Sequence, residues 1–351
     1  MKPSKRKPPS KTQTLLGVDN VIGNDWIETQ PSANKTRRTA TKVQTYLADG
    51  ISCSDSGSLA GSVGWMGCWY WGRVARAVLR PLYARSTNYG GAPQGKSVNQ
   101  LTDELRAALL YILQILRWAP VRRFSLTQKF QTKVAYADAY FTMDKRFMRP
   151  NQADSLDWQT DSSVSLENGW GLVVVNGDQT LYSYGVVPRA VLERFRKRKQ
   201  YIFLLESLAQ CLILWFFAPE LGPFFMSFCD NTSSHFSLVK GMSRDPEVNA
   251  LVGIYWAASG ILGVDPWIEV VPTKAQLADA VSRQDEAEAK ELGWVYRPLD
   301  LTVVWQVLIK ACTSPDAQYD EAAREILLAA NTVRSAAGLR PIEGLQRTDG
   351  H

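Results

Sequence analysis

Four carboxylic acids stand at the ends of predicted elements or inside apolar stretches: Asp138, Glu206, Asp230 and Asp279. Carboxylates that lie close together repel each other, and their pKa values rise. Divalent cations remove that cost, and Mg²⁺ prefers such oxygen ligands while it keeps several bound waters. Two ions about 4 Å apart can activate a water and stabilise the leaving oxygen of a phosphodiester. If the fold brings the four acids together, we expect a two-metal hydrolytic site with Mg²⁺, or alternatively Mn²⁺, as the ion.

Asp230 has the most informative surroundings of the four. It follows an apolar run, residues 224–229, that predicts a short buried strand. Asn231, Thr232 and Ser233 come next, and such residues commonly begin a helix. A strand followed by an acid and then a helix places the carboxylate at the carboxyl end of the strand, where open α/β sheets bind their ligands. The alternative is that Asp230 only caps the helix.

The other three acids each have a structural alternative as well. Asp138 lies in a predicted strand of small and apolar residues, 132–141, although Asp is depleted from strands. The alternative is an acid on an edge strand. Glu206 lies in the apolar segment 201–217, where the alternative is a partly exposed helix acid. Asp279 lies in a predicted last turn of helix and is otherwise a surface residue. Their occurrence together favours a cluster.

The elements that must position these acids are strands and helices in alternation. Period-two and apolar patterns predict five strands, and the Asn176-Gly177-Asp178 turn joins the second and third in an antiparallel meander. The predicted strands cover residues 132–141, 169–175, 179–187, 224–229 and 267–271. Helical patterns cover residues 201–217, 245–260 and 272–283. The sequence therefore predicts an α/β fold: a mixed five-stranded sheet with helices on its faces.

The motifs around the four acids resemble those of one family. The runs YADAYF, LLESLAQ, FCDNTSS and TKAQLADAVSR look like the ribonuclease H domain of retroelement reverse transcriptases, especially the DIRS/gypsy-like group. The resemblance covers about residues 101–283, and the ADxxSR ending together with the Asp-Asn pair is its most specific part. It implies a ribonuclease H-like fold and a Mg²⁺-dependent endonuclease that cleaves the RNA strand of RNA–DNA hybrids. The acids of the first strand, first helix, fourth strand and last helix would bind two Mg²⁺ ions, and they correspond to Asp138, Glu206, Asp230 and Asp279.

The segment before this domain also resembles these elements. Residues 59–85 look like the connection segment that joins polymerase to ribonuclease H, and residues 101–116 continue it. We find no YxDD-type polymerase motif in the sequence. We therefore expect the polymerase palm to be absent, and a polymerase subunit acting in trans is a candidate partner.

Two alternatives to a hybrid-cleaving nuclease stay open. The first is a catalytically inactive ribonuclease H-like module that binds nucleic acid or protein. The presence of all four acids argues against it, whereas Gln276-Leu277, where the family usually has Asn-Pro, argues for it. The second is an integrase-like or transposase-like nuclease, which expects a final Glu in place of Asp279.

Polar and basic residues near the acids are candidates for contacts with the hybrid. Asn231 and Ser233 stand at a helix start and are expected to contact the sugar edge, where the 2′-hydroxyl distinguishes RNA from DNA. Arg196, Lys197 and Arg198 belong to a basic run that is expected to hold phosphates. The alternative for this run is a solvated loop.

Composition divides the chain into four segments. Residues 1–41 are polar, basic and rich in Pro, Ser and Thr, so we expect a disordered basic tail. Residues 42–130 predict a helical connection-like segment, and residues 131–298 predict the ribonuclease H-like domain. Residues 299–351 contain two amphipathic stretches, and they predict a helical C-terminal extension without an assigned role.

Charge and residue counts restrict the class of protein. The net charge of +6 is compatible with a polyanionic partner. Five cysteines without a CxxC pair indicate reduced thiols, so we expect an intracellular protein. Two histidines argue against a His-based metal site or catalytic triad. The apolar segment 201–217 contains Glu206 and Gln210, so we expect a buried helix and no membrane association.

Overall fold

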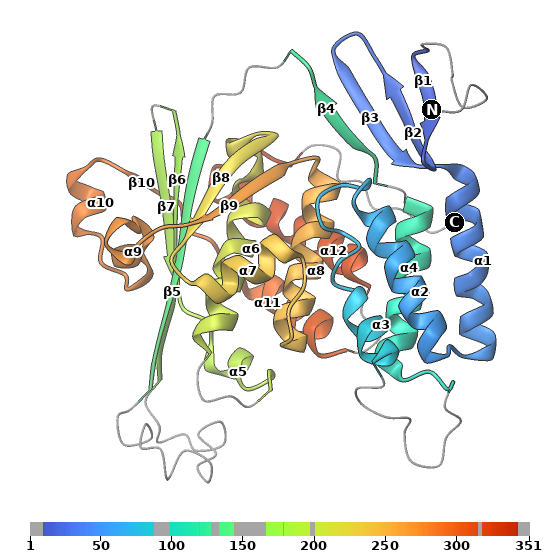
Figure 1. Ribbon diagram of the computed structural model, residues 1–351. Helices are drawn as coiled ribbons and strands as arrows, with labels where there is room; N and C mark the ends of the chain where they lie inside the picture. The colour runs from blue at the N-terminus through green and yellow to red at the C-terminus, as the bar shows by residue number, and fades with distance from the viewer. Residues whose placement is uncertain are drawn as a thin grey trace. The chain divides into compact units, whose positions relative to one another are not determined.

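The computed structural model describes residues 10–87, 99–118, 120–127, 133–143, 166–177, 179–196, 201–314 and 318–342. The chain folds as two compact units, Met1–Phe130 and Gln131–His351, which are both drawn in Figure 1. Each unit has its own β-sheet and its own helices. The four predicted metal-ligating acids all belong to the second unit.

The first unit contains an antiparallel sheet where the sequence predicted a disordered tail. Its strands, in spatial order, are β1 (Thr12–Leu15), β2 (Val18–Ile22), β3 (Trp26–Pro31) and β4 (Arg122–Ser125). For residues 10–41, the prediction of a disordered tail is therefore wrong. The physical reason is that β1, β2 and β3 pair with one another, β3 also pairs with β4, and the residues from Ala33 onward form α1, whereas composition alone shows none of these contacts.

Four helices complete the first unit: α1 (Ala33–Asp49), α2 (Cys53–Gly67), α3 (Leu79–Ser86) and α4 (Asp103–Trp118). Serine side chains begin two of them. Ser32 accepts a hydrogen bond from the backbone N–H of Lys35 at the start of α1, and Ser52 does the same from Asp55 in α2. The helical prediction for residues 42–130 is therefore confirmed for α2, α3, α4 and the second half of α1, whereas the first half of α1 lies in the predicted tail and β4 was not predicted.

The second unit is an α/β fold around a mixed sheet of six strands. The order is β10-β7-β6-β5-β8-β9. The central strands β5 (Lys133–Met143), β6 (Leu166–Asn176) and β7 (Gln179–Gly185) are antiparallel neighbours. On the other side, β8 (Phe224–Cys229) runs parallel to β5, and β9 (Asp265–Val270) runs parallel to β8. The sixth strand, β10 (Val295–Tyr296), was not predicted, because two residues carry no periodic signal.

Helices cover both faces of this sheet, as Figure 1 shows. On one face lie α6 (Ile202–Leu221) and α8 (Pro246–Leu262), which share one large core with Leu172 and Val174 of β6. On the other face lie α9 (Ala278–Ser282) and α10 (Ala287–Glu291), which form a smaller core with Val173 and Tyr182. Neighbouring residues of β6 thus point into different cores, as the alternation along a strand requires. The remaining helices of the unit are α5 (Arg189–Leu192), α7 (Thr232–Lys240), α11 (Thr302–Thr313) and α12 (Tyr319–Ala336).

Helix α6 is the apolar centre of the second unit. By length and composition it could cross a membrane, but nearly all of its residues are buried inside the unit. It carries Glu206 in its second turn. The sequence prediction of a buried helix is confirmed for this segment.

The C-terminal helices belong to this same core. Helices α11 and α12 pack against α8, and α12 also packs against α6. The fully buried Arg334 of α12 donates two hydrogen bonds of 2.9 Å to the carboxylate of Glu220 in α6. Residues 302–336 therefore complete the second unit instead of extending away from it.

Candidate metal centre

Three acids from three separate elements meet at one edge of the sheet. Asp138 lies in β5, Glu206 in α6, and Asp230 directly after β8. One carboxylate oxygen of each lies within 4.8 Å of the oxygens of the other two. Asp138 is 2% exposed and Glu206 is 3% exposed, whereas Asp230 is only partly buried. The group is therefore accessible from the side of Asp230.

The register of two parallel strands explains how Asp138 and Asp230 come together. Tyr136 of β5 pairs with Phe228 of β8. Two further residues along both strands reach Asp138 and Asp230, so these acids stand level at the carboxyl end of β8. This is the place where open α/β sheets bind ligands.

Small residues on β5 bring the third acid within reach. Ala135, Ala137 and Ala139 are fully or almost fully buried on the face that α6 covers. Because their side chains are short, α6 packs directly on β5. Glu206 lies in the second turn of α6 and extends to the edge where the two aspartates meet.

Asp279 approaches the cluster from the opposite face of the sheet. It lies in α9 and forms an ion pair of 3.1 Å with Arg283, and its side chain is 35% exposed. It is not one of the three acids within 4.8 Å of one another, but its charge acts on Asp138 and raises the pKa of that carboxyl. The structure thus brings three of the predicted acids into contact range and places the fourth nearby.

Two glycines of β6 allow α9 to approach this closely. Gly171 stands opposite Asp138 in the β5–β6 ladder. A Cβ atom at Gly171 would lie 2.3 Å from the backbone N of Ser282, and one at Gly169 would lie 2.3 Å from the carbonyl oxygen of Ser282. Helix α9 therefore packs directly against the backbone of β6, and a larger residue at Gly169 or Gly171 would prevent this contact.

Three residues that the sequence analysis did not assign to the site hold its parts in place. The hydroxyl of Ser282 donates to Oδ2 of Asp138 at 2.6 Å. The hydroxyl of Thr273 donates to Oδ2 of Asp230 at 2.8 Å. Both residues occur in the TKAQLADAVSR run, but nothing in their spacing shows that they contact acids on other strands.

The third of these residues is Gln276, which stands where the family that the sequence resembles usually has Asn. Its side chain is buried, and Nε2 donates to the carbonyl oxygen of Ala137 at 3.0 Å. This bond ties the segment before α9 to the strand that carries Asp138. Gln276 therefore helps to hold the segment before α9 against β5.

Burial and mutual repulsion determine the electrostatics of the cluster. Burial, together with the charges of Asp230 and Asp279, raises the pKa of Asp138 to about 6, although Ser282 and Arg283 oppose the shift. Burial and the same kind of repulsion, from Asp138 and Asp230, raise the pKa of Glu206 well above its usual value. Oε2 of Glu206 is buried and has no hydrogen-bond partner in the described part of the chain. Uncompensated buried carboxylates of this kind are stabilised by a bound cation.

The three acids fit a divalent metal ion. All the ligand atoms are carboxylate oxygens, which suit hard cations such as Mg²⁺, and their separation allows a single ion to contact them together.

Asp230 is not the helix cap that was its alternative interpretation. The N-cap of α7 is Asn231, whose side chain accepts from the backbone N–H of Ser234 at 3.0 Å. Asp230 is therefore free of that role.

The predicted nucleic-acid contacts have different outcomes. Ser233 is exposed in the first turn of α7, three residues after Asp230. Arg196 is exposed, and its backbone N–H donates to Glu247 at 2.6 Å. Lys197 and Arg198 lie outside the described residues.

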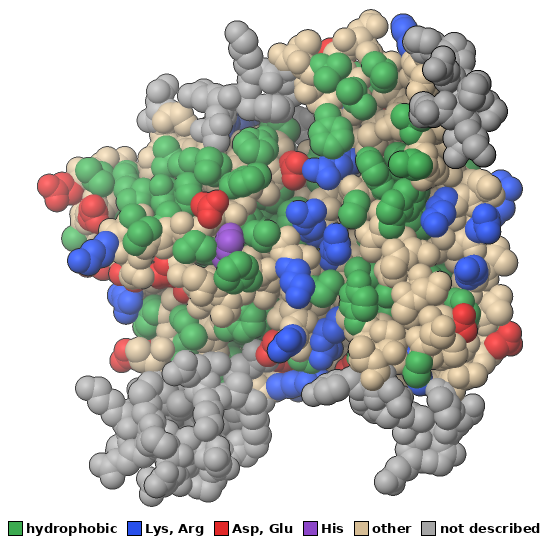
Figure 2. Space-filling view, viewed as in Figure 1, with side chains coloured by type: hydrophobic (Ala, Val, Ile, Leu, Met, Phe, Trp, Pro, Cys, Tyr) green, Lys and Arg blue, Asp and Glu red, His purple; other side chains and the backbone are tan. Residues whose placement is uncertain are grey.

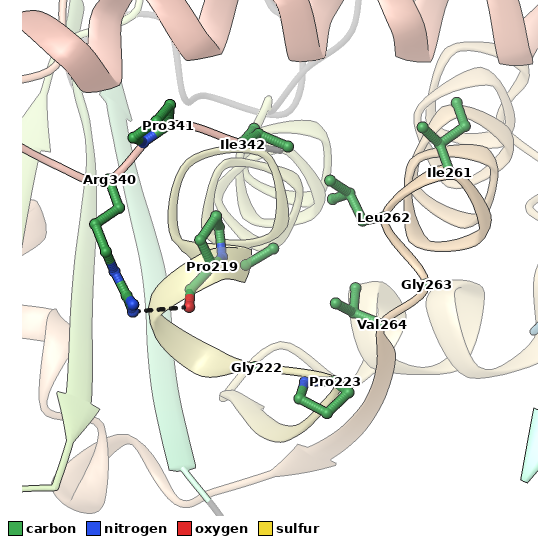
Figure 3. A pocket seen from close by; sticks show the side chains of 11 residues that line it. Pro219, Gly222, Pro223, Ile261, Leu262, Gly263, Val264, Arg340, Pro341 and Ile342 are labelled. Atoms are coloured by element: carbon green, nitrogen blue, oxygen red, sulfur yellow. Dashed lines mark hydrogen bonds between the residues drawn. The ribbon is translucent and has the colours of Figure 1, made fainter. Parts of the chain in front are cut away.

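A hollow in the second unit lies apart from the three acids (Figure 3). It has a volume of about 490 Å³ and lies where α6 and α8 end, with Pro223 and Val264 in its lining. In Figure 3 Arg340 points toward Pro219, and its guanidinium donates to the carbonyl oxygen of Pro219 at 3.3 Å. Pro223 precedes β8 and Asp230 follows it, so the length of that strand, about 20 Å, separates the two places. No acid of the described residues lines this hollow.

Comparisons of the chain with protein-family models, with curated proteins and with solved structures gave no significant match.

Proposed function

We propose that the second unit is a ribonuclease H-like endonuclease that depends on Mg²⁺ and cleaves the RNA strand of RNA–DNA hybrids. The observation that carries this proposal is the meeting of Asp138, Glu206 and Asp230 at one strand edge, with Oε2 of Glu206 buried and without a partner among the described residues. The burial of this oxygen without a donor is costly, and a bound cation would remove that cost.

The positions of the acids support the same proposal. The family that the sequence resembles has its acids on the first strand, the first helix, the fourth strand and the last helix. Asp138 lies in β5, the first strand of its sheet, and Glu206 lies in α6, the first long helix of the unit. Asp230 follows β8, the fourth strand, and Asp279 lies in α9, after the fifth strand β9.

The residues of the chain divide the work of such a site between them. Asp138, Glu206 and Asp230 would hold one ion, and Asp279 would complete the coordination of a second. Bound divalent cations supply a water of lowered pKa and stabilise the leaving oxygen of a phosphodiester. Ser282 and Thr273 each hold one oxygen of Asp138 and Asp230, which would leave the other oxygen of each acid for a metal ion.

Selectivity for RNA would come from groups beside Asp230. The side-chain oxygen of Asn231 is engaged at the start of α7, which leaves the exposed hydroxyl of Ser233 as the stronger candidate for contact with a ribose 2′-hydroxyl. The exposed Arg196 is a candidate for phosphate contact.

A cleavage assay tests the proposal. A hybrid with a labelled RNA strand, a hybrid with a labelled DNA strand and a DNA duplex are each incubated with the protein, in Mg²⁺ and in EDTA. We expect cleavage of the RNA strand in Mg²⁺ only. Binding of the hybrid without cleavage in Mg²⁺ or Mn²⁺ would instead identify the inactive module, and cleavage of the DNA duplex would identify a DNA nuclease of the same fold.

A further inference from the structure

A small hollow between two helices of the first unit combines positive charge with hydroxyl groups. It has a volume of about 110 Å³ and opens between α1 and α2. Lys35, Arg38 and Lys42 line it from α1, and Ser58 and Ser62 line it from α2. The remaining lining residues are Thr39, Tyr46 and Leu59. Among the residues that the structure describes, no acid belongs to the lining.

The three cations lie on one face of α1. Their spacing of three and then four residues places them in a row along the helix, about 10 Å long. None of the three forms an ion pair with an acid of the described residues, and Figure 2 shows Lys and Arg side chains over α1. Lys35 makes a cation–π contact, with Nζ 5.3 Å from the centre of the Trp65 ring. Like charges at this spacing repel each other, so an anion between them would stabilise the helix.

The opposite wall is unusual for a seam between two packed helices. Such seams are normally filled by apolar side chains, but α2 presents the short side chains of Ser58 and Ser62 here. Gly61 lies between them in sequence, and a Cβ atom there would meet nothing within 4 Å. The short side chains of Ser58 and Ser62 therefore leave room on the α2 side, and their hydroxyls can donate into the hollow.

The chemistry of the lining selects the ligand. Lys and Arg side chains only donate hydrogen bonds, so three of them with two serine hydroxyls require a ligand that accepts from several directions and carries negative charge. Asp55 is not in the lining but acts on Tyr46, and its carboxylate accepts from the hydroxyl of Ser52 at 2.6 Å. A tetrahedral phosphate group satisfies these donors and matches the small volume.

We propose that this hollow binds a phosphate group of a nucleic-acid strand. The choice of a nucleic acid as the source of the phosphate rests on the proposed function and on the net charge of +6. The binding chemistry itself depends only on the first unit.

The test is equilibrium binding of a fluorescent RNA–DNA hybrid to the full chain in EDTA, so that no cleavage occurs, at several salt concentrations. Arg38→Ala and Lys42→Ala remove cations that line the hollow. Arg37→Ala removes an exposed cation of the same helix that does not line it. We expect each of the first two to weaken binding several-fold and to lower the slope of log K against log salt by about one, with no change of slope for Arg37→Ala.

A second variant fills the hollow without a change of charge. Ser62→Leu places an aliphatic group among the cations, and we expect it to weaken binding as Arg38→Ala does, with an unchanged melting temperature of the protein. Inorganic phosphate, in chloride-matched buffer, should compete with the hybrid for the parent chain but not for an Arg38→Ala/Lys42→Ala double variant.

Three outcomes would overturn the proposal. Equal effects of Arg37→Ala and Arg38→Ala would show a diffuse electrostatic surface. Unaltered hybrid binding with lost phosphate binding would assign the hollow to a small phosphate compound. If no variant changed the binding, the hollow would have no role in ligand binding. Because this assay measures no cleavage, an inactive protein would refute the proposed nuclease without affecting this result, and an active nuclease with unaffected variants would refute only the phosphate site.

Discussion

The hydroxyl of Ser282 lies 2.6 Å from Oδ2 of Asp138, although 144 positions separate the two residues in the chain. This hydrogen bond links α9 to the central strand β5, and it is possible because Gly171 leaves room for the backbone of Ser282. It opposes the rise in the pKa of Asp138 that burial causes. Ser282 is thus a positioning residue for the acid at the middle of the proposed metal centre.

Ser282→Ala tests this positioning role. Without the hydroxyl, Asp138 loses its donor and its pKa rises further, so the acidic limb of the pH–rate profile should move to higher pH. We expect kcat to fall about 10-fold or more, since a second-sphere partner of a metal ligand typically contributes about 10–100-fold. Steady-state hybrid cleavage at several pH values measures both effects. Ser335→Ala, on the exposed surface of α12, is the matched control, and an unshifted profile for Ser282→Ala would assign the hydroxyl to folding alone.

The stability of the metal-free protein should fall as the pH rises through the range in which Asp138 titrates. The pKa of Asp138 is raised to about 6 in the folded protein, against about 3.9 in an unfolded chain. Between these pH values the native state holds a proton that the unfolded state has released, so this residue favours the native state below about pH 4 and loses that contribution by about pH 6. The loss amounts to about 3 kcal/mol at most.

The measurement is urea unfolding in EDTA between pH 4 and pH 7, for the parent and for Asp138→Asn. The free energy of unfolding of the parent, minus that of the variant, should decrease across this range. A constant difference would mean that Asp138 ionises normally and that the cluster needs no cation.

Gly171→Ala should displace α9. The added methyl group would lie 2.3 Å from a backbone atom of Ser282, which cannot move without the helix. We expect the variant to be destabilised by about 2 kcal/mol, as for other overpacked positions, and to lose Mg²⁺-dependent cleavage. Gly61→Ala, where the structure leaves open space, should keep both properties. Normal cleavage by Gly171→Ala would show that the close approach of α9 is not required.

The buried pair of Arg334 and Glu220 should make α12 essential to the second unit. Arg334→Met leaves the carboxylate of Glu220 buried without its partner, and we expect a loss of about 3–5 kcal/mol in the free energy of unfolding. The double variant Arg334→Met/Glu220→Leu should recover most of that loss, because no unpaired charge remains. Thermal unfolding measures both. A small effect of the single change would show that α12 is peripheral.

Much of the second unit was predictable because its signals are local. The predicted strand at residues 224–229 coincides with β8, and the apolar segment 201–217 lies within the buried helix α6 apart from its first residue. Asp138, Glu206 and Asp230 were predictable as a group because each is an acid in apolar surroundings. Burying a carboxylate in apolar surroundings costs free energy, so an acid at such a position indicates a functional role.

Other features depend on contacts that the sequence does not display. The sheet of the first unit is completed by β4, which pairs with β3 although all the helices of the unit lie between them in the chain. Thr273, Gln276 and Ser282 form hydrogen bonds with Asp230, Ala137 and Asp138. Hydroxyl and amide side chains occur throughout the chain, so the sequence alone does not distinguish these three from the others. Arg334 lies in the segment that the sequence predicted as a C-terminal extension. Its burial is explained by its partner Glu220 in α6, a contact that the sequence does not display.

The most direct test of the proposed metal centre is the cleavage rate of Asp230→Asn. The substitution keeps the volume of the side chain and an oxygen that can accept from Thr273, and it leaves the helix cap at Asn231 intact. It removes one of the three charges that would hold the metal ion. In single-turnover cleavage of an RNA–DNA hybrid in Mg²⁺, we expect a rate lower by several orders of magnitude, with hybrid binding in EDTA and thermal stability close to those of the parent. A parent that cleaves, together with an Asp230→Asn variant that cleaves at the same rate, would contradict the metal centre.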